Sequence, residues 1–123
     1  MRFTEDASSG INVIRGYAAG EIRINEQIIR DSVIVSATDL AVEPRIRGVA
    51  DLSAEHHARM LSLDPELILI GTGMRQSFPE PGFGARFLSA GIGFEVMDTG
   101  AACRTFNVLV AEQRRVVALL ILR

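Results

Sequence analysis

Two turns built from small residues are the parts of this sequence best suited to form a binding site. The first turn contains Gly71, Thr72 and Gly73, and the second begins with Asp98 and Thr99. Each turn directly follows a mostly apolar run that is typical of a buried parallel strand. Because parallel strands end at the same edge of a sheet, we expect the backbone N–H groups of both turns to face one crevice.

Two polar residues follow the second turn on a predicted helix. Helical spacing puts Arg104 and Asn107 on one side of this helix, and Arg104 should lean back toward Asp98. The helix dipole disfavours a cation so near the start of the helix, so a negative group should lie close to Arg104. Either Asp98 both caps the helix and pairs with Arg104, or Arg104 and the turns hold an anionic ligand or a carboxylate of a partner. The candidate ligand- or partner-binding residues are Gly71, Thr72, Gly73, Asp98, Thr99, Arg104 and Asn107.

No catalytic residue, metal site or cofactor is predicted, which favours a protein that is not an enzyme. The first turn lacks the Gly-Lys-Ser/Thr of a phosphate loop and the G-x-G-x-x-G of dinucleotide-binding folds. His56 and His57 are adjacent, so on a helix they point about 100° apart rather than toward one metal ion. Cys103 is either a reactive thiol near a helix N-terminus or, more commonly for such a position, a small buried residue.

Length and composition suit one small domain. The chain has 123 residues, is 48% hydrophobic and carries a net charge of −2. All of its basic residues other than the two histidines are arginines, yet no basic excess marks a nucleic-acid surface. The N-terminus has no apolar signal core, and the longest apolar run, at 116–122, is too short to span a membrane. We therefore expect a single domain over 1–123 that is soluble and cytoplasmic.

The hydrophobic pattern predicts an α/β fold. The predicted strands are 11–17, 21–29, 32–37, 66–72, 93–97 and 116–122, and 38–48 is a loop. The first three stretches form an antiparallel meander, with turn signals at Gly20, Asn25-Glu26 and Arg30-Asp31. The predicted helices are one capped by Ser53 that runs to Leu63, one over 83–90 that ends at Gly91, and one over 99–113. The apolar positions of the first helix are Ala54, Ala58 and Leu61, with Met60 as a further candidate. This order predicts a three-layer sandwich with a central mixed sheet, three helices and an N-terminal antiparallel hairpin extension.

Several segments resemble one known family. They are ELILIGTG at 66–73, FEVMDTGAACRTFNVL at 94–109, YAAGEIRINEQ at 17–27 and SVIVS at 32–36. The family consists of small α/β domains of unknown function and includes the mitochondrial complex I assembly factor 3. The resemblance implies a three-layer fold and no established catalytic activity. It also implies a role in protein assembly, which we expect to be bacterial and cytoplasmic here because the chain lacks a mitochondrial targeting extension.

Three hypotheses about function stay open. The first is a non-enzymatic protein that binds a protein partner, such as a respiratory-complex subunit, and acts as an assembly factor. The second is a domain or enzyme that binds a small anionic ligand in the crevice at the carboxyl ends of the central strands. The third is a domain that self-associates through an exposed hairpin edge.

Overall fold

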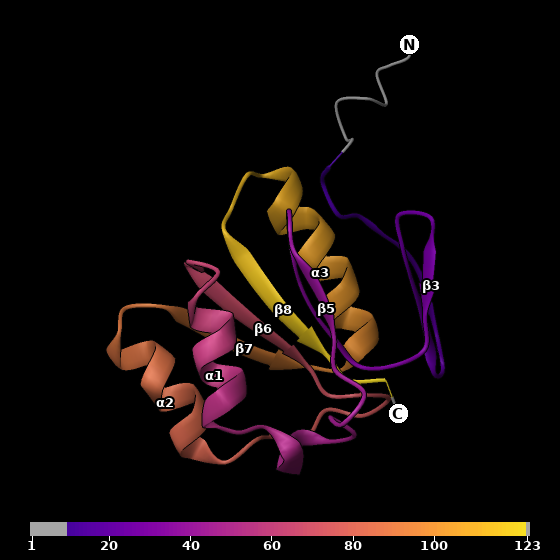
Figure 1. The fold of residues 1–123 in the computed structure, drawn as a ribbon. Coiled ribbons are helices and arrows are strands. Elements are labelled where there is room, and N and C mark those ends of the chain that lie inside the picture. Colours follow the sequence, from indigo (N-terminus) through magenta and orange to yellow (C-terminus); the bar gives the residue numbers. More distant parts are fainter. Residues whose placement is uncertain (1–9, 123) are drawn as a thin grey trace.

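The structure is a computed structural model that describes residues 10–122. Five strands form the main sheet in the order β5-β4-β8-β6-β7. Their bounds are Val33–Ser36 for β4, Leu40–Val42 for β5, Leu67–Gly71 for β6, Gly93–Met97 for β7 and Val116–Leu120 for β8. Strand β6 pairs parallel with β7 and β8, whereas β4 pairs antiparallel with β5 and β8. The main sheet is therefore mixed, as predicted (Figure 1).

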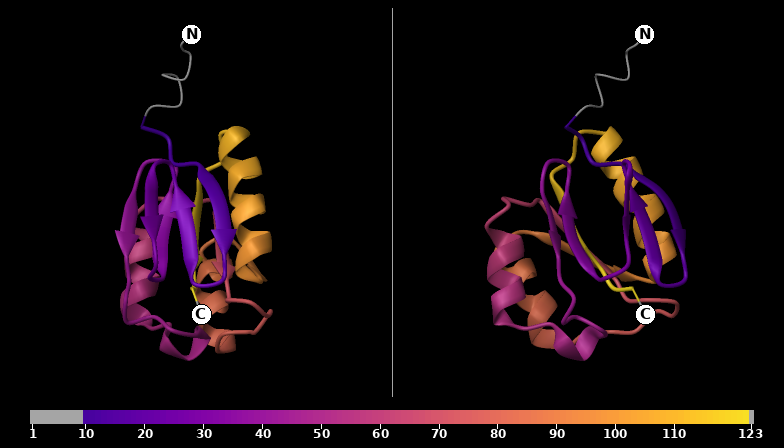
Figure 2. Two further views of the ribbon diagram at one scale, coloured as in Figure 1. Left: turned by 90° about the vertical axis from the view of Figure 1, so that its right-hand side faces the viewer. Right: turned by 45° about the vertical axis from the view of Figure 1, so that its right-hand side comes forward.

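Both faces of the main sheet are covered. Helices α1 (Ala54–Leu61) and α2 (Pro81–Ser89) lie on one face, and α3 (Thr99–Ala111) lies on the other (Figure 1). A separate antiparallel sheet packs on the α3 side, as Figure 2 shows, and a short 3-10 helix, Val49–Asp51, precedes α1. The small sheet contains β1 (Ile14–Ala18), β2 (Glu21–Ile24) and β3 (Gln27–Ile29). The predicted three-layer sandwich with three helices is confirmed.

Strand β6 shows why the central strands have almost no polar residues. Ile68 and Ile70 point into the core on the α1 and α2 side, while Leu69 points into the core on the α3 side. All three side chains are fully buried. Removing each from water contributes about 1.5–3 kcal/mol, so both layers hold this strand in place.

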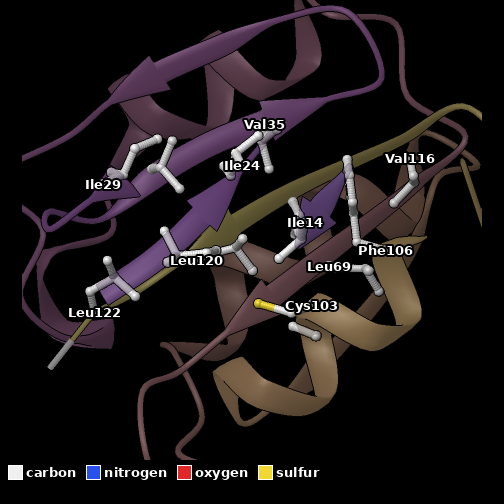
Figure 3. Close-up of a cluster of buried hydrophobic side chains, with 14 residues drawn as sticks. Ile14, Ile24, Ile29, Val35, Leu69, Cys103, Phe106, Val116, Leu120 and Leu122 are labelled. Carbon is white, nitrogen blue, oxygen red and sulfur yellow. The ribbon is translucent and has the colours of Figure 1, made fainter. Parts of the chain in front are cut away.

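The two cores differ in chemistry. The core on the α3 side is mainly aliphatic, and Figure 3 shows Cys103 and Phe106 among its aliphatic neighbours. The core on the other side holds an aromatic group in which the rings of Phe87 and Phe94 stack with centroids 5.8 Å apart. His57 joins this group, with its ring centroid 4.2 Å from that of Phe87.

Of the apolar positions predicted for the first helix, only Met60 is buried. Ala54, Ala58 and Leu61 are exposed, whereas Met60 is buried and His57 packs against Phe87. The imidazole ring of His57, rather than an alanine side chain, makes the contact with Phe87 on α2. The burial of His57 lowers its pKa, with a smaller contribution from the positive charge of Arg86.

Other differences concern the ends and partners of strands. The stretch 21–29 forms two strands, β2 and β3, joined at the predicted Asn25-Glu26 turn, where Asn25 has φ 53°. The predicted strand 32–37 corresponds to β4, which joins the main sheet instead of the meander, and the predicted loop 38–48 contains β5. Helix α3 ends at 111 because Gln113 adopts a left-handed conformation with φ 63°.

Candidate functional site

The two predicted turns lie side by side at one edge of the main sheet. Strands β6 and β7 are parallel neighbours in a register that pairs Gly71 with Met97, so the residues that follow both strands meet. The Thr72 N–H donates to the Met97 carbonyl at 2.9 Å, which ties the first turn to the end of β7. We call Gly71, Thr72, Gly73, Asp98 and Thr99 the corner.

Thr99 is the centre of the corner and is fully buried. Its Oγ1 accepts a hydrogen bond from the Gly73 N–H at 2.7 Å and donates one to the Ile121 carbonyl at 2.8 Å. Its own N–H donates to the Gly73 carbonyl at 2.8 Å. Gly73 has φ 101°, a conformation that glycine adopts without strain, so the turn can bend back onto Thr99. One hydroxyl therefore joins the first turn, the start of α3 and the segment after β8.

The other polar groups of the corner are also engaged within the protein. Thr72 Oγ1 donates to the Arg75 carbonyl at 2.6 Å and accepts from the Ser77 N–H at 3.1 Å. Asp98 Oδ1 accepts from the Ala101 N–H at 2.9 Å and so caps α3, as predicted. An oxyanion placed in the corner would find the N–H groups of Thr72, Gly73 and Thr99 already bonded. The corner is built as a structural joint.

The corner holds the segment between β6 and α2 in a defined shape. Besides the two bonds of Thr72 Oγ1, Gln76 Nε2 donates to the Val96 carbonyl at 3.0 Å. Two large apolar side chains on this segment nevertheless face solvent, with Met74 68% and Phe78 69% exposed. We call residues 74–78 the apolar loop.

Asn107 and Arg104 lie farther along α3, next to the small sheet. Asn107 Oδ1 accepts from the Ile14 N–H at 2.9 Å, and its Nδ2 donates to the Ile14 carbonyl at 2.8 Å. The Asn107 amide thus bonds to β1 as a neighbouring strand would. Arg104 is exposed, and it forms no ion pair with Asp98 or with any other carboxylate in residues 10–122. The expected pairing of Asp98 with Arg104 is therefore not found.

A pocket of about 240 Å³ lies between β1 and the first half of α3. It is lined by Ile14, Arg15, Gly16, Tyr17, Gly100, Cys103, Arg104 and Asn107, and we call it the β1–α3 pocket. The Tyr17 hydroxyl is buried and has no hydrogen-bond partner among the described residues. Burial raises the pKa of Tyr17, and the nearby Cys103 and Asp98 raise it further. No local pattern in the sequence indicates that β1 supplies Arg15 and Tyr17 to this pocket, because only the tertiary fold brings β1 to α3.

Cys103 is a buried residue and not a reactive thiol. Its exposed fraction is 5%, and burial raises its pKa to about 12. The thiol is therefore protonated at neutral pH, and a protonated thiol is a poor nucleophile.

A cavity of about 490 Å³ lies at the opposite edge of the main sheet, where β6 and β8 begin. The charged side chains there pair with one another: Arg114 Nε lies 2.8 Å from Glu66 Oε2, and Arg115 Nε lies 3.6 Å from Asp64 Oδ2. These pairs lower the pKa of Glu66, mainly through the Arg115 backbone N–H and the Arg114 side chain. The cavity wall thus offers few unsatisfied polar groups to a ligand.

Within residues 10–122, no three side chains of His, Cys, Asp or Glu are grouped so that they could hold a metal ion. His56 Nδ1 instead accepts from the Ser53 N–H at 3.1 Å at the start of α1. Across the same part of the chain, no helix has the length and apolar character to cross a membrane.

The architecture and the corner define a small three-layer α/β domain that is already represented among solved structures. A crystal structure of a protein from Bordetella parapertussis superposes with a TM-score of 0.85 at 34% identity, covering 94% of this chain and 98% of that one. The chain belongs to the family described as a protein of unknown function (DUF498/DUF598), whose model matches residues 14–121. The family resemblance predicted from the sequence is confirmed.

Two curated relatives carry informative names. The 13 kDa major membrane protein of Francisella tularensis is 32% identical over 122 residues, which cover 98% of this chain and 99% of that protein. The NADH dehydrogenase (ubiquinone) 1 alpha subcomplex assembly factor 3 of Danio rerio is 30% identical over 119 residues. That match covers 95% of this chain and 67% of the fish protein.

Proposed function

We propose that this protein is a non-enzymatic assembly factor that binds a protein partner, such as a subunit of a respiratory complex. The proposal takes its direction from the relative in Danio rerio, which is named as an assembly factor of NADH dehydrogenase and matches nearly the whole of this chain. The Francisella relative is named as a membrane protein, and this name agrees with a role in assembling a complex at a membrane.

The observation that carries the proposal is the apolar loop. Met74 and Phe78 are among the most exposed large apolar side chains of the described residues, and they lie on one short segment. The bonds of Thr72 and Gln76 hold this segment before any partner arrives, so binding would lose little conformational entropy. Exposed aromatic and methionine side chains on an ordered loop are typical anchors for a pocket on another protein.

In this proposal the corner residues act by positioning. Gly71, Gly73 and Thr99 fix the direction of the chain, Asp98 fixes the start of α3, and Thr72 shapes the loop itself. The partner would contact Met74, Phe78 and the exposed Arg75 between them.

A deletion strain complemented with variants tests the proposal. Removing the gene should lower the amount of assembled complex I on native gels, and the wild-type gene should restore it. The double variant Met74→Ser with Phe78→Ser should fail to restore it and should lose co-purification with respiratory subunits. Intact complex I in the deletion strain would exclude the assembly role.

Val108→Ser is the matched control, because Val108 is an apolar residue 55% exposed on α3, away from the apolar loop. This variant should restore assembly fully. If it fails to the same degree as the double variant, general loss of surface hydrophobicity and not the apolar loop explains the defect. Both variants should first show a wild-type unfolding temperature.

A further inference from the structure

We infer that the β1–α3 pocket binds a compact oxyanion, a phosphate or a carboxylate group, at a site separate from the apolar loop. The inference rests on the side chains that converge there from two elements that are far apart in the sequence. Residues 14–17 come from β1, and Gly100, Cys103, Arg104 and Asn107 come from α3.

The first argument is charge. Arg15 on β1 and Arg104 on α3 both line the pocket, and neither forms an ion pair with a carboxylate of the described residues. Guanidinium groups bind phosphate and carboxylate through paired N–H donors. Asp98 lies nearby and opposes an anion, but its Oδ1 is occupied by the Ala101 N–H. The positive charges of Arg15 and Arg104 outnumber the single negative charge of Asp98, which favours an anionic ligand.

The second argument is the Tyr17 hydroxyl. A buried hydroxyl without a hydrogen-bond partner destabilises the folded protein, so such a group calls for an explanation. Because its pKa is raised, Tyr17 stays protonated at neutral pH and can donate a hydrogen bond. An oxyanion in the pocket would accept that bond. Cys103 is protonated as well and adds no negative charge.

The third argument is rigidity and size. The two bonds between Asn107 and Ile14 fix β1 against α3, so the walls of the pocket are held before a ligand arrives. Gly16 and Gly100 contribute no side chain, which leaves room between the two arginines. A volume of about 240 Å³ is below the roughly 300–1,000 Å³ of pockets for drug-sized ligands. The ligand is therefore a group of few atoms, and a whole nucleotide would not be enclosed.

Titration of the purified protein tests the site. Inorganic phosphate and acetate are added in separate experiments at constant ionic strength, with chloride as the reference anion, while amide signals are followed by NMR. We expect saturable shifts at the Gly16 and Gly100 amides with at least one of the two anions. If only phosphate or only acetate causes saturable shifts, that anion is the preferred oxyanion. If both do, the site binds the oxyanion group that the two anions share.

Three variants locate the binding. Arg104→Gln should raise the Kd by about tenfold or more, because a charge-assisted hydrogen bond contributes about 1.5–3 kcal/mol. Tyr17→Phe should raise the Kd about fivefold, since it removes one donor and leaves the ring. Arg23→Gln is the matched control, because Arg23 is an exposed arginine on the adjacent strand β2 that does not line the pocket, and it should leave the Kd unchanged.

The inference is overturned if neither anion gives saturable shifts, if Arg104→Gln binds as the wild type does, or if Arg23→Gln weakens binding equally. The assay contains no partner protein, so it is independent of the proposed assembly role. The double variant at Met74 and Phe78 should bind the oxyanion normally, which separates the failure of one proposal from the failure of the other.

Discussion

The corner and the β1–α3 pocket lie on either side of the start of α3, and they use similar residues in opposite ways. In the corner, hydrogen bonds within the protein engage the turn N–H groups and the Thr99 hydroxyl. In the pocket, the Tyr17 hydroxyl and the guanidinium of Arg104 have no protein partner among the described residues. Polar residues at the ends of parallel strands therefore differ in how far folding engages their donors. What matters is whether their donors remain free after folding.

The largest effect is expected from Thr99→Val. Valine has the shape of threonine but leaves the buried Gly73 N–H and Ile121 carbonyl without their partner. The free energy of unfolding should fall by about 3 kcal/mol, seen as a Tm lower by about 10 °C. Thr99→Ser keeps the hydroxyl and should lose only about 1 kcal/mol. Equal losses in the two variants would mean that packing of the methyl group, and not hydrogen bonding, holds the corner.

A matched pair of glycine substitutions compares the two regions directly. A Cβ at Gly71 would lie 3.0 Å from Thr99 Cα and 3.1 Å from Leu120 Cδ2, so Gly71→Ala should cost about 2 kcal/mol. A Cβ at Gly100 would lie 3.4 Å from Asp98 Oδ1 and 3.5 Å from the Tyr17 ring, which is ordinary contact. Gly100→Ala should therefore raise stability by about 0.5 kcal/mol, because alanine is the better helix former. Chemical denaturation of both variants measures the difference, and similar effects would remove the distinction between a tight joint and an open pocket.

Asn107→Ala probes the wall shared by the pocket and the small sheet. The variant removes two hydrogen bonds to the Ile14 backbone and should cost about 1.5 kcal/mol. Hydrogen exchange of the Ile14 amide should become faster, while the amide of Thr99 in the corner keeps its protection. If both amides lose protection together, the two regions open as one unit.

The smallest effect is expected from Tyr17→Phe. Because the hydroxyl is buried without a partner among the described residues, its removal should not lower the free energy of unfolding and should raise it by up to about 1 kcal/mol. Thermal unfolding in a buffer with chloride as the sole anion measures this. A loss above about 1 kcal/mol would show that the hydroxyl is bonded in solution and would contradict the contrast with Thr99.

The sequence allowed the parallel core of the fold to be predicted, because local patterns determine it. Residues 93–97 were predicted with the observed bounds of β7, and the capping role of Asp98 follows from its position before a helical stretch. Strand β5 was missed because three residues at a sheet edge leave little periodicity. The place of β4 beside β8 depends on pairing between residues far apart in the chain, such as Val35 with Ala118, and no local pattern reveals that.

The candidate site, like the fold, could be predicted only where local patterns determine it. The adjacency of the two turns could be predicted, since parallel strands and their order determine it. The hydrogen bond from the Thr99 hydroxyl to the Ile121 carbonyl could not be predicted, because it joins α3 to the segment after β8. The place of Tyr17 and Arg15 in the pocket could not be predicted for a similar reason, because the packing of the small sheet determines the contact between β1 and α3.

The position of β8 has a consequence for how the protein is made. This strand is central in the main sheet, with β4 on one side and β6 on the other, yet it is the last strand of the described chain to leave the ribosome. The β4–β5 hairpin and the β6–β7 pair cannot be joined before it emerges, and Thr99 cannot complete its bonds before Ile121 is available. The main sheet can therefore close only after β8 has emerged, and until then its apolar halves depend on rapid closure or on a chaperone.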